Sequence, residues 1–90
     1  MAIGVIFEAT GVSQDQYQQV FDQVFPNGRP PRGLLNHVAG ASEDGIVVFE
    51  GWKSQEAVQQ FVEESLGEAL QQANINVQPE FIQIVNTLQP

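Results

Sequence analysis

The amino-acid sequence predicts an α+β fold in which a four-stranded antiparallel sheet carries two helices on one face. Three observations predict it: short segments with alternating apolar residues, two longer segments with apolar residues every three or four positions, and breaks rich in Gly or Pro between them. The 90 residues are 42% hydrophobic and 9% aromatic, which suits one folded domain over residues 1–90. The chain has no cysteine, which excludes disulfides and thiolate sites.

The first quarter of the chain predicts a strand followed by a helix. Residues 2–9 alternate between an apolar face and a mixed face, and the apolar face holds Ile3, Val5 and Phe7. Beyond Gly11, the pair Ser13 and Gln16 has the spacing of a capping box, in which side chains satisfy free backbone N–H groups at a helix start. An apolar stripe follows at helical spacing, formed by Tyr17, Val20, Phe21 and Val24. The helix is expected to end near Phe25, because a Pro-Asn-Gly run follows.

The middle of the chain predicts a β-hairpin that follows a stiff polar loop over residues 26–33. Residues 34–39 and 46–50 are the expected strands, and residues 40–45 form the loop between them. A connection this short favours antiparallel pairing of the two strands.

The last part of the chain predicts a second helix and a last strand. Ser54 is expected to cap a helix over residues 55–73, whose apolar positions again recur three and four residues apart. After a connector over residues 74–79, residues 81–88 are rich in β-branched side chains and predict the last strand. The order strand–helix–strand–strand–helix–strand is the ferredoxin-like arrangement, with both helices on one face of the sheet.

The expected strands carry apolar residues on both faces, which is the pattern of a sheet that is buried twice. In the third strand, Ile46 and Val48 alternate with Val47 and Phe49. Two helices with one apolar stripe each can cover only one face, so the other face needs a second cover. A second copy of the sheet is the simplest cover, because most oligomers are symmetric homodimers. We therefore expect a homodimer in which two sheets build a barrel-like core.

The charge balance argues against several classes of function. Eleven acidic residues face three basic ones, Arg29, Arg32 and Lys53, which gives a formal net charge of −8. Nucleic acids and anionic membrane surfaces are bound through clustered cations, so neither is an expected partner. No segment has 18 consecutive apolar residues, and the first ten residues lack the basic start of a signal peptide. These features predict a cytoplasmic protein.

The run over residues 46–64 ends its strand with Glu50 and Trp52 and then caps its helix with Ser54. This run and the element order resemble the dimeric α/β-barrel superfamily, which includes antibiotic-biosynthesis-type monooxygenases and stress-responsive barrel proteins. The resemblance implies a homodimer with a cavity between the helices and the sheet, or inside the barrel, in each subunit. Val48 stands where monooxygenases of the family can have an asparagine, and the second helix lacks the histidine with which haem-degrading relatives bind iron.

The single histidine, His37, and the single tryptophan, Trp52, are the first candidate site residues. Histidine suits general-base catalysis near neutral pH, so His37 is the candidate base; the alternative is a structural, hydrogen-bonded histidine. A lone imidazole in a chain without cysteine makes a poor metal site, so no metal is expected. Trp52 is either a packing anchor or one wall of a pocket. Glu50 and Asn36 are the other candidates for contact with a substrate.

Whether these side chains meet depends on the register of the predicted hairpin. If residues 39 and 46 pair, His37 lies on the face shared by Glu50 and Trp52, whereas a shift of one residue moves it to the opposite face. The sequence leaves this register open.

Three functional hypotheses follow. The first is cofactor-independent, monooxygenase-like chemistry on a small apolar or aromatic compound, with His37 as base and Trp52 as pocket wall. The second is a non-catalytic dimer that binds a hydrophobic ligand, and the third is a structural or interaction dimer. No cofactor is expected, and the chain has neither a G-x-G-x-x-G nor a G-x-x-x-x-G-K-[ST] phosphate loop.

Overall fold

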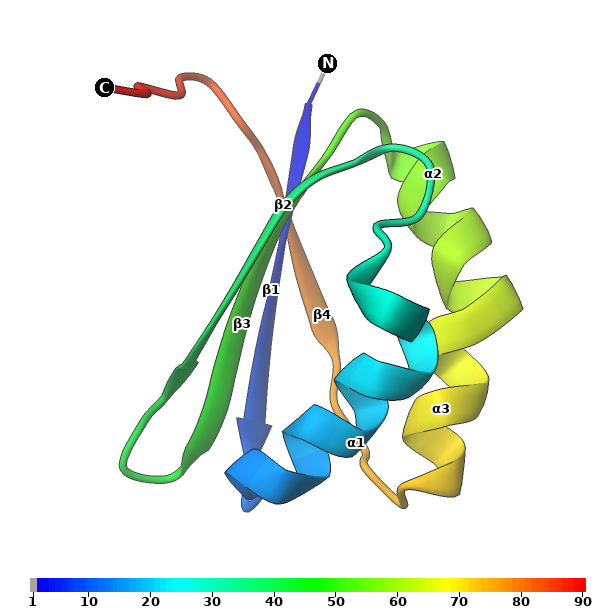
Figure 1. Cartoon of the computed structure of the whole chain (residues 1–90). Coiled ribbons are helices and arrows are strands. Elements are labelled where there is room, and N and C mark those ends of the chain that lie inside the picture. Colours follow the sequence, from blue (N-terminus) through cyan, green and yellow to red (C-terminus); the bar gives the residue numbers. More distant parts are fainter. Residues whose placement is uncertain (1) are drawn as a thin grey trace.

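The computed structural model describes residues 2–90 and has the predicted order of elements (Figure 1). The strands are β1 (Ile3–Thr10), β2 (Leu34–Ala41), β3 (Gly45–Trp52) and β4 (Pro79–Gln83). The helical elements are α1 (Gln14–Val24), the 3-10 turn η1 (Pro26–Gly28), α2 (Gln55–Phe61), the π-helical turn η2 (Val62–Leu66) and α3 (Gly67–Gln72). All helices lie on one face of a four-stranded antiparallel sheet, which confirms the ferredoxin-like α+β fold.

The sheet has the strand order β2-β3-β1-β4, so β2 and β4 are its edges. In the β2–β3 hairpin, Ala39 pairs with Val48 and His37 pairs with Glu50. This register differs by two residues from a pairing of residues 39 and 46. Because side chains alternate with a period of two, His37 still lies on the face shared by Glu50 and Trp52. Both strands run further than predicted, which shortens the loop between them to residues 42–44.

The helices begin where the sequence predicts and for the predicted reason. The Ser13 hydroxyl accepts a hydrogen bond from the Gln16 N–H at 3.1 Å, and the Gln16 side chain accepts one from the Ser13 N–H at 2.9 Å. The Ser54 hydroxyl caps the second helical segment in the same way, at 3.2 Å from the Ala57 nitrogen. This second segment is not a uniform α-helix, since the Gly67 N–H reaches back five residues to the Val62 carbonyl in the π-helical turn.

The last strand is shorter than predicted and starts earlier. The sequence predicted a strand over residues 81–88, whereas β4 covers Pro79–Gln83. β4 pairs only with β1, and the partner of Ile3, where β1 begins, is Gln83. The Ile84 N–H still donates to the Ala2 carbonyl at 3.0 Å, and beyond it the chain leaves the sheet as an extended tail (Figure 1), on which Val85 and Leu88 are 93% and 92% exposed.

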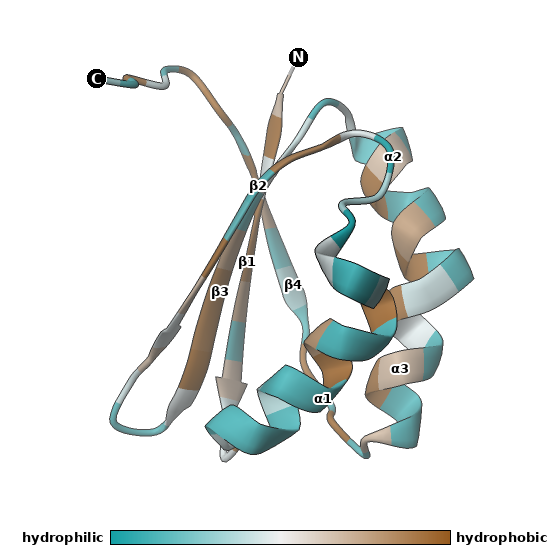
Figure 2. Cartoon of the chain, in the orientation of Figure 1, coloured by the Kyte–Doolittle hydropathy of each residue, from teal (hydrophilic) through white to brown (hydrophobic). Residues whose placement is uncertain are grey.

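The core lies between the sheet and the helices. The apolar surfaces of the helices face the sheet, whereas hydrophilic residues cover their outer sides (Figure 2). Among the buried core residues are Val5, Phe7, Val48, Trp52, Val58 and Phe61. Within residues 2–90, no helix combines the length and the apolar character needed to cross a membrane.

The opposite face of the sheet has no cover in the single chain. It exposes several large apolar side chains, among them Val38, Val47 and Ile82. Gly4 lies on this face, near the start of β1, and a Cβ placed there would come within 2.8 Å of Ile82 and 3.1 Å of Phe49. The large side chains therefore fold over the glycine, so the face is apolar across β1, β3 and β4.

Candidate functional site

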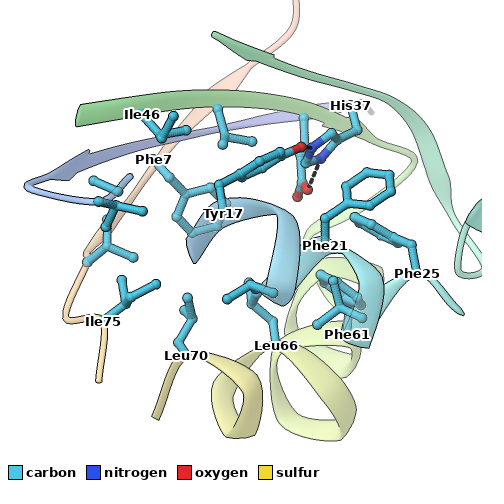
Figure 3. A pocket seen from close by; sticks show the side chains of 17 residues that line it. Phe7, Tyr17, Phe21, Phe25, His37, Ile46, Phe61, Leu66, Leu70 and Ile75 are labelled. Carbon is cyan, nitrogen blue, oxygen red and sulfur yellow. Dashed lines mark hydrogen bonds and ion pairs between the residues drawn. The ribbon is translucent and has the colours of Figure 1, made fainter. Parts of the chain in front are cut away.

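A small cavity lies between the helix-covered face of the sheet and the helices (Figure 3). The space open to the centre of a water-sized sphere is about 70 Å³. Its wall is almost entirely apolar, and Phe7, Phe21, Phe25, Phe61, Leu66 and Leu70 contribute large side chains to it. The only polar side chains on the wall are Tyr17, His37 and Glu50. They come from α1, β2 and β3, so three separate elements meet there.

Four side chains form one continuous chain of hydrogen bonds at this wall. The Tyr17 hydroxyl lies 2.6 Å from His37 Nε2, and His37 Nδ1 lies 2.7 Å from Glu50 Oε2. The Trp52 indole N–H donates to the other oxygen of Glu50, Oε1, at 3.0 Å. Tyr17, His37 and Trp52 are the single tyrosine, histidine and tryptophan of the chain, and Glu50 joins two of them, His37 and Trp52.

The hydrogen-bond partners define the direction of each donated proton. An indole nitrogen can only donate, so Glu50 accepts on Oε1, and a carboxylate also accepts on Oε2. In the tautomer that carries its proton on Nδ1, His37 donates to Glu50, and Nε2 accepts from the Tyr17 hydroxyl. This tautomer gives each of the four side chains a partner, and no buried side-chain N or O atom within residues 2–90 lacks one.

The imidazole is held by aromatic rings as well as by hydrogen bonds. The ring of Tyr17 lies nearly parallel to it, at 19°, with the centroids 6.0 Å apart. Phe21 and Phe25 present their rings at steep angles to the imidazole, 62° and 72°, at centroid distances of 5.6 and 5.3 Å. The His37 side chain is 15% exposed and that of Glu50 5%. The pair is therefore shielded from water, which strengthens its electrostatic interaction.

The surroundings also act on the Tyr17 phenol. Burial raises the pKa of Tyr17 above its ordinary value of 10.0, and the nearby charge of Glu50 raises this pKa further. Both causes disfavour a phenolate. The Tyr17 hydroxyl therefore keeps its proton at neutral pH and acts as a hydrogen-bond donor.

The structure brings some of the sequence-predicted site residues together and separates others. His37 and Glu50 are partners at the cavity. Trp52 is fully buried behind the wall, where it holds Glu50 and packs on Phe61 at a centroid distance of 5.2 Å. Asn36 is exposed and lies away from the cavity, where its side-chain oxygen accepts a hydrogen bond from the Gly51 N–H at 2.7 Å.

Tyr17 is the site residue that sequence reasoning did not identify. Its position in the apolar stripe of the first helix marked it as a core residue. The signal in the sequence is that its hydroxyl is the only polar group on that stripe, and a buried hydroxyl needs a partner. That partner, His37, lies 20 residues away, and only the fold brings the two together.

The described part of the chain, residues 2–90, contains no group of three or more His, Asp or Glu side chains that could hold a metal ion. The polar groups at the cavity are one carboxylate, one imidazole and one phenol. Together they can accept, hold and donate a proton beside an apolar space.

Comparison with known proteins places this architecture among solved structures. A structure of Rv0793 from Mycobacterium tuberculosis superposes with a TM-score of 0.75 and 16% identity over 99% of this chain and 100% of that chain. SnoaB, a cofactor-independent oxygenase from Streptomyces nogalater, gives a TM-score of 0.68 at 12% identity over 99% and 97% of the two chains. A protein from Chloroflexus aurantiacus, provisionally assigned as an antibiotic biosynthesis monooxygenase, gives 0.70 at 16% identity over 99% and 98%.

These similarities establish the fold, because identities this low carry no residue-level assignment. The predicted resemblance is confirmed at the level of the fold, which this chain shares with these solved structures. No protein-family model matches the sequence, and no curated protein matches it.

Proposed function

We propose that this protein carries out cofactor-independent, monooxygenase-like chemistry on a small apolar or aromatic compound, with His37 as the base. The observation that carries the proposal is the buried Glu50–His37 pair at the wall of an apolar cavity, with a distance of 2.7 Å between Oε2 and Nδ1. The fold shared with SnoaB, a cofactor-independent oxygenase, supports the same class of reaction.

The geometry suits proton abstraction. With the proton on Nδ1 held by Glu50, the Nε2 atom of His37 has a lone pair that can accept a proton from a substrate. The imidazolium that forms is stabilised by the carboxylate beside it, as in other base–carboxylate pairs. For a substrate with an acidic methylene group, the carbanion then reduces dioxygen. The balanced reaction is R–CH2–R′ + O2 → R–CO–R′ + H2O, with the substrate as the reductant.

Trp52 and Asn36 take different roles in this proposal from the ones the sequence suggested. Trp52 acts as a positioning residue, because its N–H holds Glu50 Oε1 and its ring stays behind the wall. Asn36 has no contact with the cavity and is assigned to the outer surface, where it ties β2 to β3 through Gly51. Direct contact with a substrate is assigned to His37 and to the aromatic side chains of the cavity wall.

We also propose that the working form is a homodimer built on the uncovered face of the sheet. This face exposes Val38 (61%) and Val47 (39%), and it also carries Glu8 beside Val47 on β1 and Glu80 on the edge strand β4. Exposed large apolar side chains grouped on one face mark an interaction surface. A typical stable interface removes about 800 Å² per partner from water, an area that a four-stranded face can supply.

A second candidate function is binding of a hydrophobic ligand without catalysis. The observation in its favour is the cavity wall, which is almost entirely apolar. The cavity volume of about 70 Å³ is below the roughly 300–1,000 Å³ of common ligand pockets and limits such a ligand to a small one. Its polar groups also already satisfy one another. A compact apolar ligand fits such a space without any reaction.

Oxygen consumption with a small C–H acid tests the catalytic proposal. We expect the wild-type protein to accelerate oxygen uptake by 4-hydroxyindane-1,3-dione, a flat compound with an acidic methylene group and one hydroxyl. His37→Gln, which keeps most of the side-chain volume, should lower the rate by roughly 100-fold or more, the usual contribution of a general base. Glu63→Gln, the exchange of an exposed carboxylate in η2, serves as the matched control and should leave the rate unchanged.

The outcomes separate the two candidates. Uptake that is equally fast in wild type and His37→Gln contradicts a base at this position. If wild type binds the dione, seen as a change in the fluorescence of the single Trp52, and yet consumes no oxygen, the non-catalytic function holds instead.

A further inference from the structure

The Tyr17 hydroxyl occupies the one nitrogen of His37 that could meet a ligand. His37 Nδ1 is held by Glu50 at 2.7 Å, and Nε2 is held by Tyr17 at 2.6 Å (Figure 3). Both nitrogens are thus engaged inside the protein. A ligand in the cavity can reach the imidazole only where Tyr17 gives way.

We infer that Tyr17 is a specificity-determining residue, which admits to His37 only those ligands that bring a hydrogen-bond donor of their own. The inference rests on the proposed site at His37 but not on a reaction there. The ligands it selects are compact, flat, apolar molecules that carry one hydroxyl group. Such a ligand replaces the Tyr17 phenol on Nε2 with an equivalent group.

The energetic reason is the environment of Nε2. The imidazole lies among the rings of Tyr17, Phe21 and Phe25, where no other side chain donates to Nε2. A ligand without a donor would displace Tyr17 and leave this nitrogen without a partner. Leaving a shielded acceptor unpaired weakens binding by roughly 10- to 100-fold. A ligand with a hydroxyl restores the bond and avoids this loss.

Two features of Tyr17 make it suited to this exchange. Its phenol remains protonated at neutral pH, because burial and Glu50 raise its pKa, so in the resting state it is a donor of the same kind as the ligand hydroxyl. It is also only half-buried, near the start of α1, whereas Val20 and Val24 further along the same helix are buried in the core. Tyr17 can therefore be displaced with less loss of packing than the buried residues of that helix.

Phenol and anisole are the matched probes, since they share a ring and differ in the hydroxyl hydrogen. Binding is measured by calorimetry and by the ¹⁵N chemical shifts of the single histidine, which report directly on Nε2. We expect wild type to bind phenol at least roughly 10-fold more tightly than anisole. We expect Tyr17→Phe to bind phenol roughly 10-fold more tightly than wild type does, because no hydroxyl has to be displaced.

The direction of the Tyr17→Phe effect separates this inference from the ordinary alternative. If Tyr17 were part of the binding surface and donated to the ligand, its loss would weaken phenol binding. Phe21→Leu is the control, because Phe21 touches the imidazole without a hydrogen bond; it should change phenol and anisole binding alike.

Three results would overturn the inference: equal binding of phenol and anisole to wild type, weaker phenol binding by Tyr17→Phe, or no phenol binding by either protein at millimolar concentration. The measurement is independent of turnover. A protein that prefers phenol through Nε2 but consumes no oxygen with the dione keeps this inference and loses the proposed catalysis. Oxygen uptake that depends on His37, without a preference for phenol over anisole, keeps the proposed catalysis and contradicts this inference.

Discussion

The two faces of the sheet differ in how far their apolar side chains are buried, and neighbouring residues of β3 show the contrast. Val48, on the helix-covered face, is 8% exposed, whereas Val47, on the other face, is 39% exposed. The covered face also includes a polar residue, Glu50, which is buried with both oxygens satisfied. The open face has apolar side chains and no cover of its own.

Apolar character and chemical function are therefore separate properties of a face. Both faces are apolar, but only the covered one closes around a hydrogen-bond chain, because α1 brings Tyr17 against β2 and β3. Shielding by the helices makes those hydrogen bonds strong and specific. The open face has no comparable buried hydrogen-bond chain, and its exposed apolar side chains suit association with another apolar surface.

The largest expected effect comes from placing a charge on each face in turn. Val48→Asp should cost at least about 4 kcal/mol of unfolding free energy, since it buries an unpaired carboxylate, and should leave the protein largely unfolded.

Val47→Asp should keep its helical circular dichroism but weaken self-association by at least roughly 100-fold in sedimentation experiments. Val47→Ala, which adds no charge, is the control for the second variant. Unchanged association of Val47→Asp would show that the open face is not the interface.

Removing the central acceptor of the covered face should have the next largest effect. Glu50→Ala leaves the donors of Trp52 and His37 without a partner and should cost about 2–4 kcal/mol in urea denaturation. Glu50→Gln should cost only about 1 kcal/mol, because its oxygen still accepts from Trp52.

Glu50→Gln should also reverse the rest of the hydrogen-bond chain. The glutamine NH2 would donate to His37 Nδ1, so the imidazole proton would move to Nε2 and be donated to the Tyr17 oxygen. The ¹⁵N spectrum of the single histidine distinguishes the two tautomers. An unchanged tautomer in Glu50→Gln would contradict the assigned proton directions.

The smallest expected effect appears at alkaline pH and concerns the covered face alone. The pKa of Tyr17 is raised in the folded protein, so between 10.0 and that higher value the unfolded state binds fewer protons than the folded state. Stability should therefore fall as the pH rises through this window, and be fully present below it. Tyr17→Phe should lack this pH-dependent loss of stability, whereas Val47→Ala on the open face should show it. Unfolding free energies measured in urea across this pH range provide the comparison, and parallel curves for wild type and Tyr17→Phe would contradict it.

Much of the fold could be predicted from local patterns. The capping box of Ser13 and Gln16, the apolar stripes of the helices and the alternation in β1 each depend on residues close together in the chain. Those patterns report backbone geometry directly, so the element order and the faces of β1 and β3 followed from them. The end of β4 did not follow, because β-branched residues continue past Gln83 and only the lack of a partner beyond the start of β1 ends the strand.

By itself, the sequence determined the α+β architecture, the two-sided apolar character of the strands, and the candidacy of His37, Glu50 and Trp52. The tertiary structure decided how these side chains meet: the hairpin register puts His37 beside Glu50, and the packing of α1 puts Tyr17 on its remaining nitrogen. The reason is the distance along the chain over which each signal acts. Periodicity encodes which way a side chain points within its own element, whereas a hydrogen bond between residues 13 or 20 positions apart exists only after the elements have docked.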